Sequence, residues 1–445
     1  MGIVIILALV IGLPLIPRCL RVCLLLPLAV FQVYPPWLVV GQLPVPLALV
    51  VAYAFWPELL KEAKFLFSVK PIRIILGISI ITVVSFLWSV NVRLGLVSLN
   101  AFLSFIAVFA GIASQARSDS RWITRALTIF YLAMMVFAAS VVMFRFAPVE
   151  KLLFLKTNLA TWFISSNTLT ELFSDGRNNV FDPEKSGGFA FVNGNAASTF
   201  LGFVAMTALG SAFAYRSRSH FIMGIILTAA VPFAGSKAGM MLILPMLAVL
   251  FLFRVSEKDR GIVSILLVQV TAIAIISYKI MNIGHSGMSS VVSSRVADTA
   301  DTRFQMWGFA LKMFLENPIL GQGFGGWQIE FPAYARFSGV PTDLPPHNTF
   351  IYLWSQSGIV ALTLGVALVV WILKKALEGA GAADVESKGL GVMLLLSYTW
   401  LLIQGFGENQ GLIGDVHIQP ILATVLALFT VRASLNGKTT RGKSA

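Results

Sequence analysis

Long runs of apolar residues dominate the chain, and most of them are as long as a helix that crosses a membrane. A window of roughly 20 residues, the length that spans the hydrocarbon core of a bilayer, finds these runs at 2–17, 19–33, 37–56, 74–90, 94–114, 126–144, 193–214, 220–236, 238–253, 261–283, 349–373, 389–406 and 418–431. Of the 445 residues, 57% are hydrophobic and 12% are charged, about half the charged share of a soluble domain. These proportions exclude a soluble enzyme, a disordered chain and a disulfide scaffold.

The runs predict an all-α fold, in which residues 1–445 form one polytopic integral membrane domain with about twelve transmembrane helices. The first two runs are short, and Arg18 and Arg21 interrupt them. If both runs cross the membrane, the N-terminus lies outside. If they supply one crossing between them, both termini lie in the cytoplasm, which the tight turn at Tyr34-Pro35-Pro36 favours. No base precedes Arg18, so the start lacks the charged region of a cleavable signal peptide.

The distribution of the net charge of +13 predicts the orientation of these helices. The whole excess falls in seven polar segments, and the rest of the chain carries as many acids as bases. Because cytoplasmic loops of membrane proteins are enriched in Lys and Arg, we expect these segments in the cytoplasm. The same distribution argues against a nucleic-acid partner. The segments are 18–21, 58–73, 115–125, 215–220, 254–260, 374–388 and 432–445.

Two long segments, 145–195 and 284–348, are then expected on the outer side. Loops of this length are usually functional or disordered, and both contain helix-like apolar patterns. In the second segment, Thr302 and Gln305 form a capping box, and Asn317-Pro318 would end the helix that it starts. The apolar residues between them recur at helical spacing. The pattern predicts an amphipathic helix that begins near residue 302 and lies at the membrane surface.

Arg303 falls in the first turn of that expected helix. The free amides of a helix start attract anions, so Arg303 and these amides could together hold a diphosphate. Arg295 lies eight residues earlier and could converge on the same anion. The alternative is a solvated surface arginine. Two lysines near outer turns, Lys185 and Lys237, could also bind a lipid-linked phosphate, although Lys237 could equally extend to the headgroups.

His347 is the candidate general base. It follows Pro345-Pro346, which restrict the backbone immediately before an apolar run, and imidazole can accept a proton from a hydroxyl near neutral pH. The alternative is a histidine that only hydrogen-bonds the loop. If His347 is structural, the next candidates for the base are Asp343, Glu408 and His417.

Cofactor and metal motifs are weak in this sequence. The glycine-rich segment 321–326 follows no predicted strand, so we interpret it as a close-packing turn and not as a nucleotide loop. Asp298 and Asp301 form an acidic pair, but such a pair beside a helix start is more often a cap than a metal ligand set. The sequence therefore predicts no metal site and no cofactor.

At this point the chain resembles the O-antigen ligase family, which also includes O-antigen polymerases and bacterial O-oligosaccharyltransferases. The resemblance depends on the order of short motifs along the outer segments. These motifs are Gly188 to Asn195 (GFAFVNGN), Gly235-Ser236-Lys237, Arg303 with Trp307, Pro318 to Gly326, and His347-Asn348 leading into Ser357-Gly358.

This resemblance implies a membrane glycosyltransferase in the bacterial inner membrane, with its active site facing the periplasm. It would transfer a glycan from undecaprenyl diphosphate to a sugar hydroxyl of lipid A-core, inverting the anomeric centre without a metal. His347 matches the family's histidine and Arg303 the arginine ahead of the tryptophan. Lys185 and Lys237 stand where the family commonly has arginine, and they keep the charge but lose the two-pronged guanidinium.

Two other functions compete with this one. An O-antigen polymerase of the same family would share every motif and differ only in the acceptor. From a different class, a lipid-linked glycan flippase or transporter would also be helical, with basic residues inside. Proton- or sodium-coupled transporters usually carry acids within the membrane, and the middle of every assigned run lacks Asp and Glu.

Overall fold

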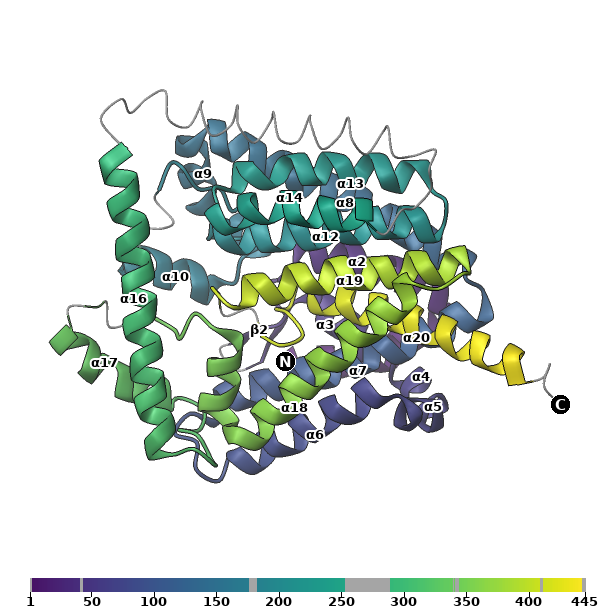
Figure 1. Ribbon diagram of the computed structural model, residues 1–445, viewed down its shortest axis with the longest axis horizontal. Helices are drawn as coiled ribbons and strands as arrows, with labels where there is room; N and C mark the ends of the chain where they lie inside the picture. Colours follow the sequence, from purple (N-terminus) through teal and green to yellow (C-terminus); the bar gives the residue numbers. More distant parts are fainter. Residues whose placement is uncertain are drawn as a thin grey trace.

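The computed structural model describes residues 2–40, 43–175, 182–252, 289–338, 340, 344–408 and 411–441. Nearly all of its regular structure is helical, as the apolar runs predicted (Figure 1). The helices are α1 Gly2–Gly12, α2 Arg18–Phe31, α3 Leu47–Tyr53, α4 Trp56–Lys61, α5 Ala63–Ser68, α6 Lys70–Ser85, α7 Val92–Ser118, α8 Arg121–Phe146, α9 Pro148–Leu155, α10 Ser166–Asp175, α12 Gly194–Ala214, α13 Arg218–Ala230, α14 Lys237–Leu252, α16 Ser289–Glu316, α17 Gly326–Ser338, α18 Thr349–Ala380, α19 Val385–Gly405 and α20 Gln419–Arg441. Short 3-10 turns lie at Leu13–Leu15 (η1), Ala160–Trp162 (η2) and Val231–Ala234 (η3).

Four of the described helices, α7, α8, α12 and α18, are long and apolar enough to cross a membrane. Shorter apolar helices lie at Gly2–Leu15, Arg218–Ala234, Lys237–Leu250 and Gln419–Leu435. The chain is therefore an all-α, multi-pass membrane protein. The figure of about twelve crossings stays a prediction, and the apolar run 261–283 lies outside the described residues.

One predicted membrane helix is wrong. The run 37–56 contains a short hairpin in which β1 (Val39–Val40) pairs antiparallel with β2 (Leu43–Pro44), and only then the seven-residue helix α3. Pro44 and Pro46 explain the break, because proline lacks the amide hydrogen that a helix interior requires. Seven residues of helix reach only about 10 Å, so α3 alone cannot span a bilayer.

The centre of the fold is α12, whose side chains are buried on all faces. It packs most extensively against α19 and α13. Gly202 lets the ring of Trp400 lie directly against the α12 backbone, and the indole Nε1 of Trp400 donates to Thr199 O at 3.0 Å. This close packing fixes α12 relative to α19, and both helices lead into the candidate site.

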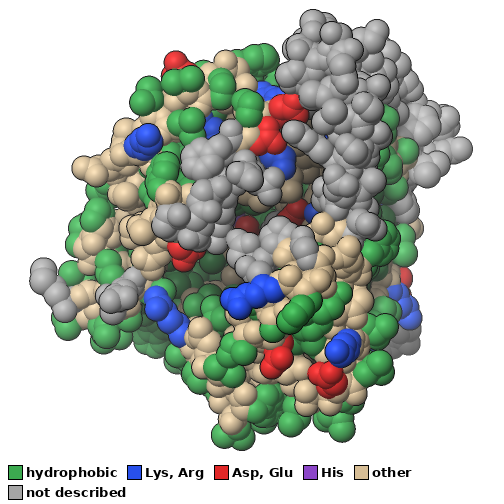
Figure 2. Space-filling view, turned by 90° about the vertical axis from the view of Figure 1, so that its left-hand side faces the viewer, with side chains coloured by type: hydrophobic (Ala, Val, Ile, Leu, Met, Phe, Trp, Pro, Cys, Tyr) green, Lys and Arg blue, Asp and Glu red, His purple; other side chains and the backbone are tan. Residues whose placement is uncertain are grey.

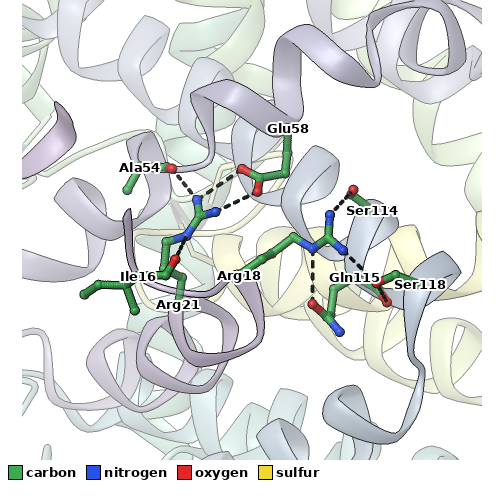
Figure 3. Close-up of polar contacts among 8 residues, drawn as sticks. All are labelled: Ile16, Arg18, Arg21, Ala54, Glu58, Ser114, Gln115 and Ser118. Atoms are coloured by element: carbon green, nitrogen blue, oxygen red, sulfur yellow. Dashed lines mark hydrogen bonds and ion pairs between the residues drawn. The ribbon is translucent and has the colours of Figure 1, made fainter. Parts of the chain in front are cut away.

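Two arginines at the start of α2 connect this helix to its neighbours (Figure 3). Arg21 is 3% exposed and pairs with Glu58 on α4, with 2.6 Å between Nη2 and Oε1. It also donates to the carbonyls of Ile16 and Ala54. Arg18 reaches instead to the side chains of Ser114, Gln115 and Ser118 at the end of α7. A buried cation is stable only when it is paired and hydrogen-bonded, and Arg21 satisfies both conditions.

The long helices lie side by side, and α16 runs across one end of them (Figure 1). Helices α9, α10 and α17 lie at the same end, whereas the C-terminus lies at the opposite end. The two segments expected outside the membrane, 145–195 and 284–348, therefore have their described helices at one end of the molecule.

Candidate active site

The helix that carries Arg303 is longer than the sequence predicted. It starts at Ser289 and ends at Glu316, so Asn317-Pro318 ends it as expected. The capping box at Thr302 is wrong, because neither proline nor glycine interrupts 289–302 and the helix continues through. Arg303 therefore lies in the interior of α16, and its surroundings are not a helix start with free amides.

The same extension removes the reason for assigning Asp298 and Asp301 to a cap, since both lie inside α16. Arg295 also lies on this helix, two turns before Arg303, but its side chain lies outside the described residues. Its proposed part in anion binding stays a prediction.

The glycine-rich segment after α16 packs into a break in α18. Gly358 has a φ of +77° inside α18, which interrupts the helical hydrogen bonds there. This segment and the residues just before it supply partners for the freed groups: Ile319 O accepts from Ile359 N at 3.1 Å, and Gln322 N donates to Ser355 O at 2.7 Å. A Cβ at Gly358 would collide with the Ile319 carbonyl. Two motifs that are distant in sequence thus meet, which confirms the close-packing interpretation of this turn.

His347 stands immediately before α18 in an unusual backbone conformation. Its φ is +47°, in the left-handed region that a non-glycine residue rarely adopts. The next residue, Asn348, caps α18 by accepting from Phe350 N and Ile351 N at 2.9 and 3.2 Å. The cap and the two prolines fix the chain on either side of His347, which accords with the rigidity predicted for it. Its side chain is 22% exposed.

Arg303 and His347 meet at a third residue, Glu408, which follows the end of α19. Arg303 Nη2 lies 3.4 Å from Glu408 Oε1, and His347 Nδ1 lies 3.5 Å from Oε2. Asn195, in the first turn of α12, donates from Nδ2 to the same Oε1 at 2.8 Å. Both segments expected outside the membrane and the end of α19 therefore converge on one carboxylate. The sequence placed Glu408 only in reserve and gave Asn195 no separate role.

The two predicted lysines lie on turns that pack against each other. Ser186 N donates to Ala234 O at 3.2 Å, and a Cβ at Gly235 would collide with Glu184 O. Lys237 begins α14 and is exposed, whereas Lys185 is half-buried. Lys185 also borders the start of α12, because its Cβ lies 3.1 Å from the position of a Cβ built on Gly194. The structure thus places Lys185 beside the turn that leads into Lys237. Lys185 also lies beside Gly194, the residue before Asn195.

Two further cations hold the segment of Lys185 in place. Arg145 Nη1 donates to Pro183 O at 2.9 Å, and Lys151 Nζ donates to Lys185 O at 3.0 Å. Lys151 is 3% exposed, and burial lowers its pKa to about 8. Nearby Asp182 opposes this shift, and Arg145 and Lys185 add to it. Sequence patterns gave no signal for Lys151, because its role depends on a backbone carbonyl 34 residues away.

Several buried polar atoms at this end lack a partner within the part of the chain that the structure describes. They include Trp307 Nε1, His347 Nδ1, Thr349 Oγ1 and Gln404 Nε2. Buried polar groups in folded proteins are nearly always hydrogen-bonded, so each exception requires an explanation. Figure 2 looks onto this end and shows a hollow with charged side chains inside it and Lys or Arg side chains around it. Donors such as Trp307 Nε1 and Gln404 Nε2 are therefore buried at this end without an acceptor among the described residues.

The other histidines within the described residues are packed into the protein. His220 is fully buried and contacts the hydroxyls of Thr128 and Ser211. His417, named in reserve, places Nδ1 3.0 Å from Ala29 O, and its ring packs on Phe191. Burial lowers the pKa of His417 to about 4. Asp343, the other reserve candidate, lies outside the described residues.

Comparison with known proteins agrees with the resemblance seen in the motifs. The O-antigen ligase family model matches residues 222–366, about a third of the chain. The match includes Lys237, Arg303, His347 and the glycine-rich segment, whereas Asn195 and Glu408 lie outside it. No curated protein matches the chain. Over residues 222–366, the chain is therefore similar to the O-antigen ligase family.

Proposed function

We propose that this protein is an O-antigen ligase of the bacterial inner membrane. It transfers a glycan from undecaprenyl diphosphate to a sugar hydroxyl of lipid A-core, at the periplasmic face. The observation that carries the proposal is the convergence of Arg303 and His347 on one carboxylate, at the end of the molecule where α9, α10, α16 and α17 gather. A cation and an imidazole at one place match what the reaction requires, namely charge stabilisation and proton acceptance.

The reaction needs no activated sugar other than the lipid-linked donor. His347 accepts the proton of the acceptor hydroxyl while the hydroxyl oxygen forms a bond to the anomeric carbon. The bond from that carbon to the diphosphate oxygen breaks, and its electron pair leaves with undecaprenyl diphosphate. The imidazolium then returns its proton to water. Direct attack of this kind inverts the anomeric configuration.

Arg303 stabilises the negative charge that develops on the leaving diphosphate, and Arg295, Lys185 and Lys237 contribute further positive charge. A preorganised cation that meets developing charge in a site sheltered from water is often the largest single contribution to catalysis. The side chain of Arg303 is 32% exposed, so a ligand can reach its guanidinium. Trp307 Nε1, which is buried without a hydrogen-bond partner among the described residues, is suited to bind the sugars.

Reconstitution tests the proposal most directly. The purified protein in liposomes would receive an undecaprenyl-diphosphate glycan and lipid A-core, and the products would be separated by mass. Glycan on lipid A-core supports the ligase. Glycan extended on undecaprenyl diphosphate would identify a polymerase, and movement of the intact donor across the bilayer without transfer would identify a flippase.

Substitution of Arg303 tests its contact with the diphosphate. We expect Arg303→Ala to lower kcat/KM for the donor more than Arg303→Lys does, because lysine keeps the charge but loses the paired donors of the guanidinium. The measurement is transfer rate against donor concentration in the reconstituted system. Exposed Arg336 on α17 offers a matched control, and Arg336→Ala should leave the rate unchanged. Wild-type rates in both Arg303 variants would mean that Arg303 is a solvated surface arginine that does not contact the diphosphate.

Removal of divalent metal ions gives a second test. We expect transfer to persist in excess EDTA, because the charge of the diphosphate is met by side chains, chiefly Arg303, with Arg295, Lys185 and Lys237. The measurement compares initial rates before and after dialysis against EDTA. A rate that disappears and returns only with Mg²⁺ or Mn²⁺ would contradict the expectation and direct attention to Asp298 and Asp301.

A further inference from the structure

Resting on the proposed function, we propose that Glu408 is the positioning residue of the site. Its carboxylate holds the imidazole of His347 with Nδ1 protonated, which leaves Nε2 free to accept the proton of the acceptor hydroxyl. The family match ends at residue 366, so Glu408 lies outside the matched residues, and it is the fold that brings it to the site.

The two oxygens of Glu408 have different partners. Oε1 accepts from Asn195 Nδ2 at 2.8 Å and faces Arg303 Nη2 at 3.4 Å. Oε2 faces His347 Nδ1 at 3.5 Å. The first oxygen is therefore held by α12 and α16, which orients the carboxylate and directs the second oxygen to the imidazole.

Burial makes this arrangement specific. The side chain of Glu408 is 13% exposed, and Nδ1 of His347 is buried with no hydrogen-bond partner among the described residues. A buried ring nitrogen without a partner is costly, and Glu408 Oε2, 3.5 Å away, is a carboxylate oxygen that can only accept a hydrogen bond. The tautomer with hydrogen on Nδ1 satisfies both atoms. The 3.5 Å separation needs to shorten by a few tenths of an ångström, as catalytic contacts do when substrate binds.

The carboxylate also stabilises the imidazole after it has accepted the proton. When Nε2 accepts the proton, the ring becomes positively charged, and a neighbouring carboxylate stabilises that charge. Arg303 shares this carboxylate in the present structure. When a bound diphosphate draws Arg303 toward itself, more of the negative charge of Glu408 is available to stabilise the imidazolium.

Kinetics of Glu408→Gln, Glu408→Asp and the control Glu330→Gln test the proposal. Glu330 is exposed on α17 at the same end of the molecule. We expect Glu408→Gln to lower kcat by up to about 10⁴-fold, the loss seen when the carboxylate that sets the tautomer of a catalytic histidine becomes an amide, with little change in KM for the donor. Glu408→Asp should recover part of the rate, because the charge remains. Glu330→Gln should match the wild type.

The split between kcat and KM separates positioning from a structural role. The charged groups gathered around the imidazole, among the described residues, are Glu408 and, across its carboxylate, Arg303. A variant that only misfolds would yield less active protein but keep the kcat of each folded molecule. An unchanged kcat for folded Glu408→Gln would overturn the proposal.

Nitrogen NMR of histidine-labelled protein tests the tautomer without any turnover. The signals of His347 would be assigned as those missing from the spectrum of His347→Asn. Nδ1 of His347 should be protonated in the wild type and lose that preference in Glu408→Gln. If the wild type transfers no glycan but its Nδ1 is protonated and Glu408→Gln loses that preference, the proposed function fails and the positioning of His347 stands. If transfer occurs and His347 shows no dependence on Glu408, the function stands and the positioning fails.

Discussion

His347→Asn should lower glycan transfer by about 10²- to 10⁴-fold, the usual loss when a general base is removed, while the protein still inserts and binds the lipid-linked donor. Asparagine is the informative replacement because it tolerates the left-handed backbone that His347 adopts at φ +47°. It cannot accept a proton at neutral pH. The measurements are initial transfer rates in liposomes and donor binding in detergent.

Two companion variants make this result interpretable. His347→Ala removes the base and adds backbone strain, so a larger drop in its thermal stability than in that of His347→Asn would report the strain. His220→Asn changes a buried histidine that contacts Thr128 and Ser211, and it serves as a control for the loss of any histidine. Transfer by His347→Asn at the wild-type rate would make His347 structural and leave Glu408 as the foremost candidate for the base.

Glu58→Gln should destabilise the folded protein by about 3 to 5 kcal/mol, the cost of breaking a buried ion pair by removing one partner. Glu58 is 7% exposed and pairs with Arg21 at 2.6 Å. Without the carboxylate, the buried guanidinium has lost its anion, and its remaining contacts among the described residues are two backbone carbonyls and the face of Phe55. The measurement is the free energy of unfolding in mixed micelles, from denaturant titration.

The exposed pair of Lys375 and Glu378 offers the matched control, because Glu378→Gln removes a carboxylate that water already solvates. We expect no measurable change in unfolding for that variant. The double variant Arg21→Met/Glu58→Met should recover most of the lost stability, since apolar residues of similar volume can replace a buried pair. An unaltered unfolding curve for Glu58→Gln would mean that water solvates Arg21.

Apolar patterns predicted the helical class well, because burial in a membrane leaves a strong and local signal. Run 94–114 lies within α7 and run 126–144 within α8, and each helix extends beyond the run by two to five residues at its ends. The failures are also local. Run 37–56 was apolar enough for a membrane helix, but Pro44 and Pro46 decide its backbone, and hydropathy ignores the missing amide hydrogens.

The candidate site was predicted less completely, because its central contacts join distant parts of the chain. Arg303 and His347 carried recognisable motifs, but Asn195 and Glu408 are 213 positions apart, and neither has a local pattern that points to the other. The capping box at Thr302 failed for the opposite reason. Its pattern was present, but a helix already under way does not need a new start.

The position of Glu408 late in the sequence has a consequence for biosynthesis. A ribosome makes the chain from the N-terminus, so Asn195, Arg303 and His347 all emerge before the carboxylate on which they converge. Until α19 has folded and residue 408 has reached its place, Arg303 lacks its anion and the imidazole of His347 lacks its neighbour. A nascent chain that already contains all of residues 222–366 therefore still has an open, unassembled site, and the last loop to arrive completes it.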